Sequence, residues 1–337
     1  MTNETSGSLT ADRRAEFARG YAEAGDFAAA AELIAQALEL APDHLAFLAL
    51  YGEWLDKAGR AADAAGIWTR MLRLDPEDRF GAQLKLASLG LTETPDAPPA
   101  AYVESLFDDF APRFETALVE RLDYHAPQLL AGAIAAALGP DGQALRHAVD
   151  LGCGTGLMGE HLRRRASFLE GVDLSAGMLK RAAAKRIYDR LDKGDVAAIE
   201  PEGEPGRADL AVAADVYIYL GDLAAAFALA ARLLELRGLY AFTVEAHDGP
   251  EDYALRPSLR YAHSETYLRR ALGEAGFEVV TLDRIFLRMD GTERIEGHLV
   301  VARKAGGIIE LPAAGTRETP PVRTAHRVAA PDMENRR

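Results

Sequence analysis

The chain of 337 residues has a single cysteine, few aromatic residues and no long apolar segment. The lone cysteine, Cys153, excludes an internal disulfide and fits a reducing compartment, so we expect a cytoplasmic protein. No apolar run approaches the roughly 18 residues of a membrane span, and the polar segment 1–10 lacks a signal-peptide core. We therefore expect neither a membrane protein nor a secreted one.

Basic residues are also scarce. Lys and Arg number 38 against 52 Asp and Glu, which gives a formal net charge of −14 at pH 7. Nucleic-acid phosphates bind basic surfaces, so we expect no nucleic-acid partner. The composition, with 49% hydrophobic and 27% charged residues, is typical of a soluble globular protein, and the length suggests about two domains.

Several chemical motifs are missing from the sequence. It has no paired cysteines or His-x-x-x-His spacing, no Gly-x-Ser-x-Gly turn and no Gly-Lys-Ser/Thr phosphate loop. We therefore expect no metal site and no serine nucleophile of the hydrolase type.

The most informative stretch is Asp150-Leu151-Gly152-Cys153-Gly154-Thr155-Gly156. It ends an apolar run, 145–151, that predicts a buried strand, and a helix is expected over 157–165. A glycine-rich turn between a strand and a helix brings backbone N–H groups close to a ligand. The spacing is G-x-G-x-G followed by Leu157, so the dinucleotide motif G-x-G-x-x-G is not met.

Three further acids follow apolar segments. Asp173 lies 21 positions after Gly152, where an acid at the tip of the adjacent strand can bind a ribose diol. Asp195 follows a short strand-like segment, and the buried strand expected over 208–213 leads to Asp215. Ser175 is expected to cap the helix that begins there.

The motif D-x-G-x-G-x-G with these acids resembles the class I methyltransferases, which bind S-adenosylmethionine. The resemblance implies an α/β fold with a seven-stranded, doubly wound, Rossmann-like sheet over residues 141–304. Its last two strands are expected at 277–289 and 294–303, joined by a hairpin turn.

By the same resemblance, the glycine turn holds the methionine end of the cofactor, Asp173 the ribose and Asp195 the adenine. Transfer of the methyl group would convert the cofactor to S-adenosyl-L-homocysteine. The residues expected to bind the cofactor are Asp150, Gly152, Cys153, Gly154, Gly156, Leu157, Asp173, Leu174, Ser175, Met178, Gly194, Asp195, Val196, Ala214 and Asp215.

Residues 12–90 are helical and repetitive. Gly25 and Gly59 are 34 residues apart, as are Pro42 and Pro76, and this period resembles tetratricopeptide repeats. Two repeats and a capping helix are few for independent stability. We expect this all-α domain to pack on the catalytic domain or on a second copy of the chain, or to offer a groove to a protein partner.

The remaining segments are assigned by composition. Residues 1–11 and 305–337 are expected to be flexible, and 91–100 to be a linker. Residues 101–140 are expected to be helical, with aromatic side chains that either pack on the core or, as in similar small-molecule methyltransferases, cover the cofactor. From residue 12 to 304 the chain resembles bacterial predicted methyltransferases with N-terminal repeats, which are similar to those of the ubiquinone and biotin pathways.

A sulfonium methyl is already activated, so the protein has mainly to align the acceptor and exclude water, and needs a base only if the acceptor must lose a proton. The candidate catalytic residues are His247, Glu245 and Tyr219, although 245–248 can also be an exposed loop. Arg256 and Arg260, which follow the fifth long strand, can clamp a carboxylate or phosphate of the acceptor, or pair with surface acids. The residues expected to bind the acceptor are Tyr102, Phe107, Phe110, Tyr217, Arg256, Arg260, Tyr261 and His263.

The expected function is methyl transfer from S-adenosylmethionine to O, N or C of a small molecule. One alternative is a methyltransferase of proteins or carrier proteins that recruits its substrate through the repeats. A second is a non-catalytic adaptor, against which the acids Asp150, Asp173 and Asp195 argue, because an adaptor has no need of them.

Overall fold

The computed structural model describes residues 5–115, 124–139, 144–198 and 205–306, all of which belong to one compact unit. The expected C-terminal tail lies almost entirely outside the described residues. Within the described part, none of the helices combines the length with the apolar composition that a bilayer span requires.

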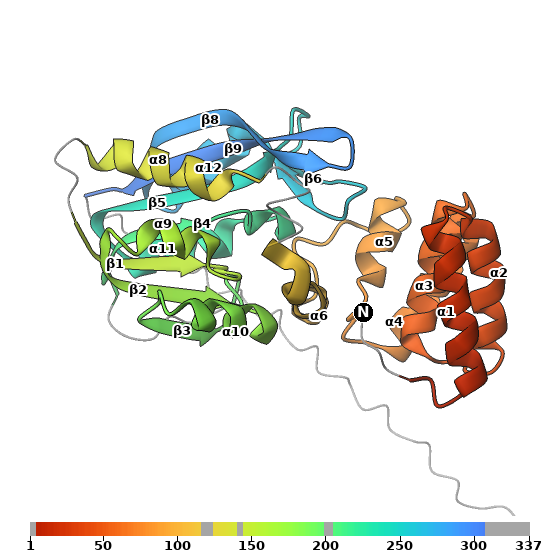
Figure 1. Cartoon of the computed structure of the whole chain (residues 1–337). Helices are drawn as coiled ribbons and strands as arrows, with labels where there is room; N and C mark the ends of the chain where they lie inside the picture. Colours follow the sequence, from red (N-terminus) through yellow and green to blue (C-terminus); the bar gives the residue numbers. More distant parts are fainter. Residues whose placement is uncertain (1–4, 116–123, 140–143, 199–204, 307–337) are drawn as a thin grey trace, which may run out of the picture. The chain divides into compact units, whose positions relative to one another are not determined.

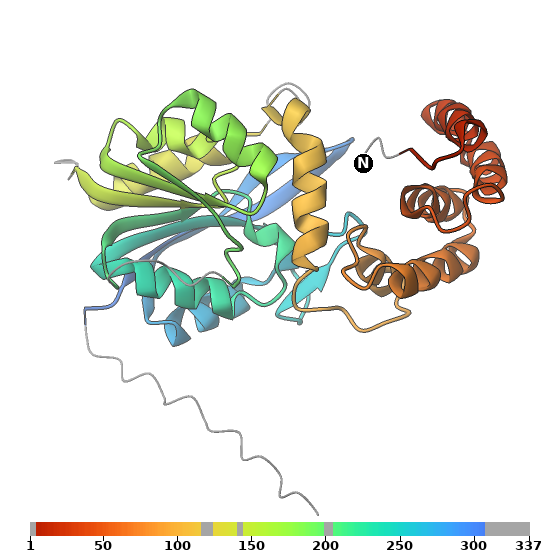
Figure 2. The same cartoon turned by 90° about the horizontal axis from the view of Figure 1, so that it is seen from below.

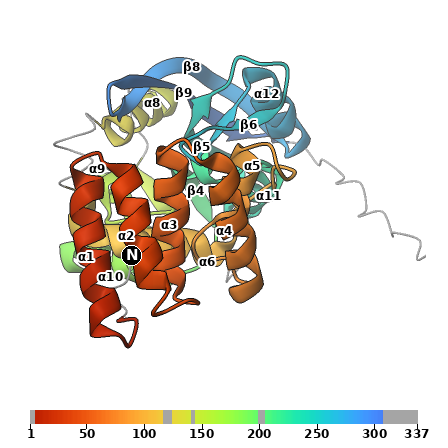
Figure 3. The ribbon, with the colours of Figure 1, turned by 90° about the vertical axis from the view of Figure 1, so that its right-hand side faces the viewer.

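The N-terminal region consists of helices only (Figures 1 and 3). They are α1 (Leu9–Glu23), α2 (Phe27–Leu38), α3 (Leu45–Lys57), α4 (Ala61–Leu74) and α5 (Ala82–Ser88). Gly25 (φ +84°) and Gly59 (φ +79°) form the turns inside the two helix pairs, in a conformation that glycine adopts without strain. The expected repeat architecture is therefore present, with α1 beginning three residues before the expected start.

Small residues let these helices approach one another closely. Ala30, Ala31 and Ala64 are fully or almost fully buried, and the indole ring of Trp68 lies against Gly52, where no Cβ would fit. Helix α1 is capped by Ser8 and α2 by Asp26, each of which accepts a backbone N–H of the first turn.

The rest of the chain is built on a sheet with the strand order β3-β2-β1-β4-β5-β9-β8, in which β9 is antiparallel to both neighbours and the first five strands are parallel (Figure 1). These seven strands are β1 (Leu145–Leu151), β2 (Ala166–Asp173), β3 (Arg190–Lys193), β4 (Ala208–Ala213), β5 (Leu234–Ala246), β8 (Phe277–Asp290) and β9 (Glu293–Lys304). They confirm the α/β sheet and the closing hairpin expected from the sequence.

The described part of the sheet nevertheless has nine strands rather than seven. The two additional strands, β6 (Tyr253–Leu255) and β7 (Tyr261–His263), lie where the sequence indicated a loop. They form because β7 pairs with the last residues of β5 and because Tyr261 and His263 are completely buried. Such pairing between distant segments leaves no local pattern in a stretch of three residues.

Helices cover both faces of the sheet (Figure 2). Helices α8 (Ala126–Leu138) and α9 (Leu157–Leu162) pack on one face, and α11 (Ala224–Leu233) and α12 (Glu265–Glu274) on the other. Helix α10 (Ala176–Lys185) packs on β2 and β3. Because the first five strands are parallel, their carboxyl ends meet at one edge, which is where a ligand binds in such sheets.

Candidate active site

The glycine turn connects β1 to α9 at this edge. Gly152 (φ +68°) and Gly154 (φ +55°) line a cavity, and both have left-handed backbone conformations. A Cβ at Gly152 would lie 2.5 Å from Cγ2 of Val216, so only glycine fits there. The turn thus places backbone without side chains at the wall of the cavity, close against Val216.

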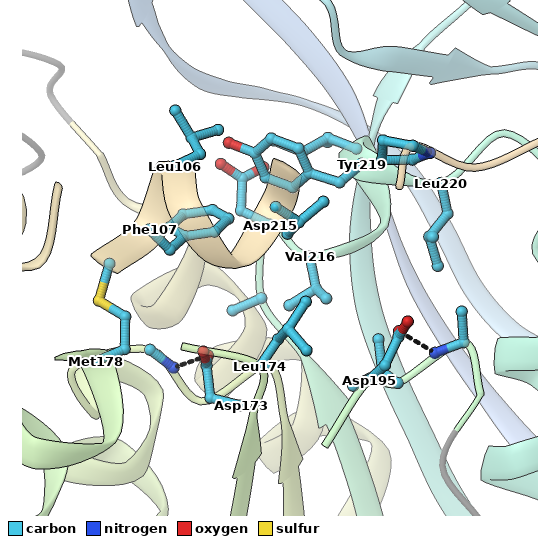
Figure 4. Close-up of a pocket in the computed structure, with 18 of the residues that line it drawn as sticks. Leu106, Phe107, Asp173, Leu174, Met178, Asp195, Asp215, Val216, Tyr219 and Leu220 are labelled. Carbon is cyan, nitrogen blue, oxygen red and sulfur yellow. Dashed lines mark hydrogen bonds between the residues drawn. The ribbon is translucent and has the colours of Figure 1, made fainter. Parts of the chain in front are cut away.

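Asp173 ends β2 beside this turn. Its Oδ2 accepts the Gly154 N–H at 2.8 Å (Figure 4). Its Oδ1 accepts the Ser175 N–H, also at 2.8 Å. Burial raises the pKa of this carboxyl group, and the two backbone hydrogen bonds oppose that shift. A carboxylate can accept about four hydrogen bonds, so Asp173 keeps capacity for a ligand in the cavity.

Asp195 follows β3 on the same rim. Its Oδ1 accepts the Ala197 N–H at 2.9 Å, which orders the turn around it (Figure 4). The cavity between these elements has a volume of about 350 Å³, within the range usual for small-molecule sites. The expected cofactor-binding residues that line it are Gly152, Gly154, Asp173, Leu174, Met178, Gly194, Asp195, Val196, Ala214 and Asp215.

Helix α6 (Ala100–Phe110) forms one wall of the cavity through Val103, Leu106, Phe107 and Phe110. The ring of Phe107 packs edge-on against Tyr219, with 5.1 Å between centroids. No residue of α6 is fully buried, so the helix covers the cavity rather than filling the core.

Polar contacts attach α6 to the cofactor side of the sheet. Oδ1 of Asp108 accepts from Ser175 Oγ (2.5 Å) and from the N–H of Gly177 (2.9 Å), which satisfies the N-terminus of α10. Glu104 forms an ion pair with Lys193 at 2.6 Å.

The segment expected to be a linker also contributes to the wall. The carbonyl oxygen of Asp96 accepts the N–H groups of Gly221 (2.7 Å) and Asp222 (3.1 Å), and its side chain accepts from Tyr253 Oη (2.6 Å). Ala97 and Pro98, which follow it, line the cavity. Composition indicated a linker because Thr and Pro are frequent there, but hydrogen bonds to distant loops hold it in place.

Asp215, Arg288 and Arg260 also line the cavity. Nη1 of Arg288 lies 3.0 and 2.7 Å from the two carboxylate oxygens of Asp215, and its Nη2 contacts Glu245. The Arg288 side chain is only 2% exposed. Burial lowers the pKa of this guanidinium, but the carboxylates of Asp215 and Glu245 outweigh the effect and raise it above its ordinary value.

Five of the expected cofactor-binding residues do not line the cavity: Asp150, Cys153, Gly156, Leu157 and Ser175. Asp150 is 1% exposed and accepts a hydrogen bond from Tyr188 Oη at 2.6 Å. Burial raises its pKa to about 7. The acid that opens the motif is therefore enclosed behind the glycine turn.

The structure also separates most of the candidate acceptor residues from the cavity. Tyr217 is buried in the core, where it meets the hydroxyl of Tyr240, and Tyr102 packs against Gly81 of the repeat region. Arg256 donates to the carbonyl of Ala246 (3.0 Å). Tyr261 Oη donates to the carbonyl of Pro95 (2.6 Å). Phe107, Phe110 and Arg260 do line the cavity.

Of the three candidate catalytic residues, Tyr219 lines the cavity. His247 lies instead on the loop after β5, with its Nε2 3.1 Å from Glu251, and Glu245 supports Arg288 from behind. The most important residue that the sequence analysis missed is Arg288, because regular alternation along β8 does not distinguish it from the exposed Arg284.

His263 is a buried histidine that supports the site from outside. Its Nε2 donates to the carbonyl of Gly221 at 3.0 Å, and burial lowers its pKa to about 4. An unfolded histidine titrates near 6.5. Between about pH 6.5 and 4 the unfolded chain therefore binds more protons at this site, so its contribution to stability is complete above that window and lost as the pH falls through it.

We expect the free energy of unfolding to lose on the order of 2–3 kcal/mol through His263 across this window. The H263Q variant keeps an N–H donor for Gly221 but does not titrate, so its stability should depend less on pH. Urea unfolding at pH 7.5, 5.5 and 4.5 measures the slope, with H161Q as the matched control at a half-exposed site. An identical slope in H263Q and the unchanged chain contradicts the prediction.

Seven strands of the sheet in this order, a glycine turn after β1 and acids at the tips of β2 and β3 together are typical of the methyltransferase fold. Residues 122–282 match the family model described as a methyltransferase domain, and residues 21–88 match that of the tetratricopeptide repeat. Residues 122–282 therefore form a methyltransferase domain that follows N-terminal tetratricopeptide repeats. This confirms the methyltransferase and repeat domains and the α/β fold class expected from the sequence.

Similar proteins cover only parts of the chain. Methyltransferase-like protein 27 of Homo sapiens is 38% identical over 96 residues, which are 28% of this chain and 38% of that protein. The chain thus aligns with well under half of this curated relative. The crystal structure of the cyclase SpnF has a TM-score of 0.50 at 17% identity and covers 63% of this chain and 98% of its own, a similarity of fold alone.

A second solved structure, that of a methyltransferase with two bound molecules, is similar to part of the chain. The 1,6-didemethyltoxoflavin-N1-methyltransferase of Burkholderia thailandensis, with bound 1,6-didemethyltoxoflavin and S-adenosylhomocysteine, has a TM-score of 0.48 at 22% identity. It covers 64% of this chain and 93% of its own.

Proposed function

We propose that the chain transfers a methyl group from S-adenosylmethionine to a small molecule held beneath α6. The observation that carries this proposal is a single cavity with Asp173 and Asp195 on one side and Asp215 with Tyr219 on the other. The bound cofactor would supply a methyl group already activated on its sulfonium.

The residues of the chain fit this role. The missing Cβ at Gly152 lets the backbone of the turn lie against Val216 at the wall of the cavity, and the free acceptor capacity of Asp173 suits a ribose diol. Asp195 would accept from the adenine amine. The aromatic side chains of α6 would exclude water and limit the orientations of the acceptor, which lowers the barrier of a displacement reaction.

No base is assigned. Burial raises the pKa of Tyr219, so its hydroxyl stays protonated at neutral pH and does not act as a base. Positioning is therefore the main contribution of the protein. Calorimetric binding of S-adenosylmethionine and S-adenosylhomocysteine tests the proposal, together with homocysteine release in the presence of candidate acceptors. Absence of binding by both ligands contradicts it.

Asp173→Ala should weaken S-adenosylhomocysteine binding by about 10- to 100-fold, the loss expected for one or two hydrogen bonds to a charged group. It should also lower stability by about 1–3 kcal/mol, because two buried backbone N–H groups lose their acceptor. Calorimetry and urea unfolding measure the two effects.

Asp189→Ala is the matched control. Asp189 also accepts a backbone N–H, that of Leu169 at 2.7 Å, and pairs with Arg163, but it does not line the cavity. This variant should lose stability and keep its affinity. Equal affinity in both variants removes Asp173 from the ribose role.

A second candidate, methylation of a protein, is supported by a groove of about 360 Å³. Residues of α3 to α5 line one side of it, including Lys57 and Lys85, and α6 lines the other side with Tyr102 and Leu106. Leu106 also lines the cofactor cavity, so a chain bound in the groove would contact the helix that covers the site.

Deletion of residues 1–90 separates the two candidates. The cut retains Pro95 and Asp96, which the catalytic domain binds. If the acceptor is a small molecule, turnover and cofactor affinity should stay within about threefold of the full chain, a difference below 1 kcal/mol. Loss of turnover with intact cofactor affinity favours a protein acceptor, and the full-length variant K85E should then reproduce the loss.

A further inference from the structure

The end of the cavity where the acceptor would bind is apolar apart from a charged cluster of Asp215, Arg260 and Arg288. Its apolar side chains come from α6 and from the segment after β4, and they are Val103, Leu106, Phe107, Val216, Ile218 and Leu220. A charge that enters such a site without a partner carries a large desolvation cost. The charged cluster therefore decides which ionic states an acceptor can have.

The cluster depends on an irregularity in β8. The register between β8 and β9 shifts between Phe286 and Arg288, which leaves Leu287 as an extra residue without a partner. Ile285 pairs with Gly297 and Arg288 with Ile295, so the shift places Ile285 and Arg288 on the same face although they are three residues apart. Leu287 and Arg288 are both buried. Gly297 of β9 makes room, because a Cβ there would collide with Leu287. Bulges of this kind redirect side chains beside active sites.

The backbone of Asp215 is also fixed in position. It has φ +60°, an unusual conformation for a residue other than glycine, and its N–H donates to Thr243 Oγ1 at 2.9 Å. Its carboxylate is 13% exposed and lines the cavity. Each oxygen accepts one bond from Arg288 and keeps acceptor capacity on the cavity side.

Among the residues that the structure describes, both cations that line this end of the cavity are paired. Arg288 lies between Asp215 and Glu245, and Nη1 of Arg260 lies 2.8 Å from Asp290. Two guanidinium groups thus face three carboxylates, a formal charge of −1. Within the described residues, an anionic acceptor would meet no unpaired cation at this end and would have to approach Asp215.

We propose that the acceptor carries no negative charge and presents an N–H or O–H group to Asp215, and that Arg288 acts as a positioning residue that sets this preference. The inference rests on the proposed function. Of the two sequence-based alternatives for Arg256 and Arg260, it favours pairing within the protein over a clamp for a carboxylate or phosphate, because Arg256 donates to the carbonyl of Ala246 and Arg260 pairs with Asp290.

Three compounds built on the same ring test the inference, bound to the full-length protein saturated with S-adenosylhomocysteine. They are 3,4-dihydroxybenzamide, 3,4-dihydroxybenzoate, which carries a negative charge, and the dimethoxy compound 3,4-dimethoxy-N,N-dimethylbenzamide, which has no N–H or O–H donor. The dihydroxy amide should bind at least tenfold more tightly than either of the others. Equal or tighter binding of the carboxylate or of the dimethoxy compound overturns the inference, as does binding by none of the three.

A charge variant distinguishes a specific role from a structural one. Glu245→Gln removes one acid behind Arg288, so binding of the carboxylate probe should strengthen about tenfold while that of the dihydroxy amide changes less than twofold. Glu296→Gln is the matched control, since Glu296 pairs with the exposed Arg284 on the same hairpin. Equal changes for both probes in E245Q overturn the role of Arg288.

Failure of this inference and failure of the proposed function give different results. If S-adenosylhomocysteine does not bind, the proposed function fails. If it binds and the carboxylate probe is preferred, methyl transfer stands and the acceptor class is anionic.

Discussion

Arg288→Met should lower the free energy of unfolding by about 3–5 kcal/mol at pH 7, because it leaves the carboxylates of Asp215 and Glu245 close together without their cation. The cost arises from desolvation, since Arg288 is only 2% exposed and Glu245 is 4% exposed. Burial already raises the pKa of Glu245, so acidification should protonate it in the variant and reduce the difference. Urea unfolding at pH 7.5 and 5.5 measures both effects.

The same strand provides the control for this variant. Arg284 also pairs with two carboxylates, those of Asp248 and Glu296, but its side chain is 44% exposed. Arg284→Met should cost no more than about 1 kcal/mol, as is usual for ion pairs in water. Similar losses in the two variants would mean that burial of the Arg288 cluster has no energetic consequence.

Gly152→Ala should reduce S-adenosylhomocysteine affinity by about 100-fold, or roughly 2.7 kcal/mol. The new Cβ would lie 2.5 Å from Cγ2 of Val216, and the backbone has φ +68°, so either the turn or the segment that carries Val216 must move. Both border the cavity. Calorimetry measures the affinity, and urea unfolding should show a loss of about 1–3 kcal/mol from the strain.

Two variants separate the causes of this effect. Gly132→Ala in α8 adds a Cβ that meets nothing within 4 Å, so it should keep the affinity and gain up to about 1 kcal/mol of stability. Val216→Ala combined with Gly152→Ala removes the collision but not the strained φ, and should restore part of the affinity. No recovery in the double variant would assign the whole effect to the backbone.

Local patterns in the sequence were sufficient for the architecture. Apolar runs that end in acids predicted the parallel strands, and the carboxyl ends of such strands meet at one edge by topology alone. Asp173 and Asp195 could therefore be brought to one rim without a structure. The repeats could also be identified from the sequence, because a 34-residue period with glycine at each turn reflects one structural unit that occurs twice.

The inner part of the site was decided by contacts between distant segments. Arg288 faces the cavity only because the register shift beside Leu287 reverses the alternation of β8, and no pattern in the sequence marks that shift. His263 and Asp96 support the site from outside, because both form hydrogen bonds with backbone groups of the turn at residues 221–222. The sequence by itself determined which helices and strands form and which strand ends lie at the same edge of the sheet. The tertiary structure decided which charges meet in the apolar interior, since pairing and desolvation depend on neighbours remote in the chain.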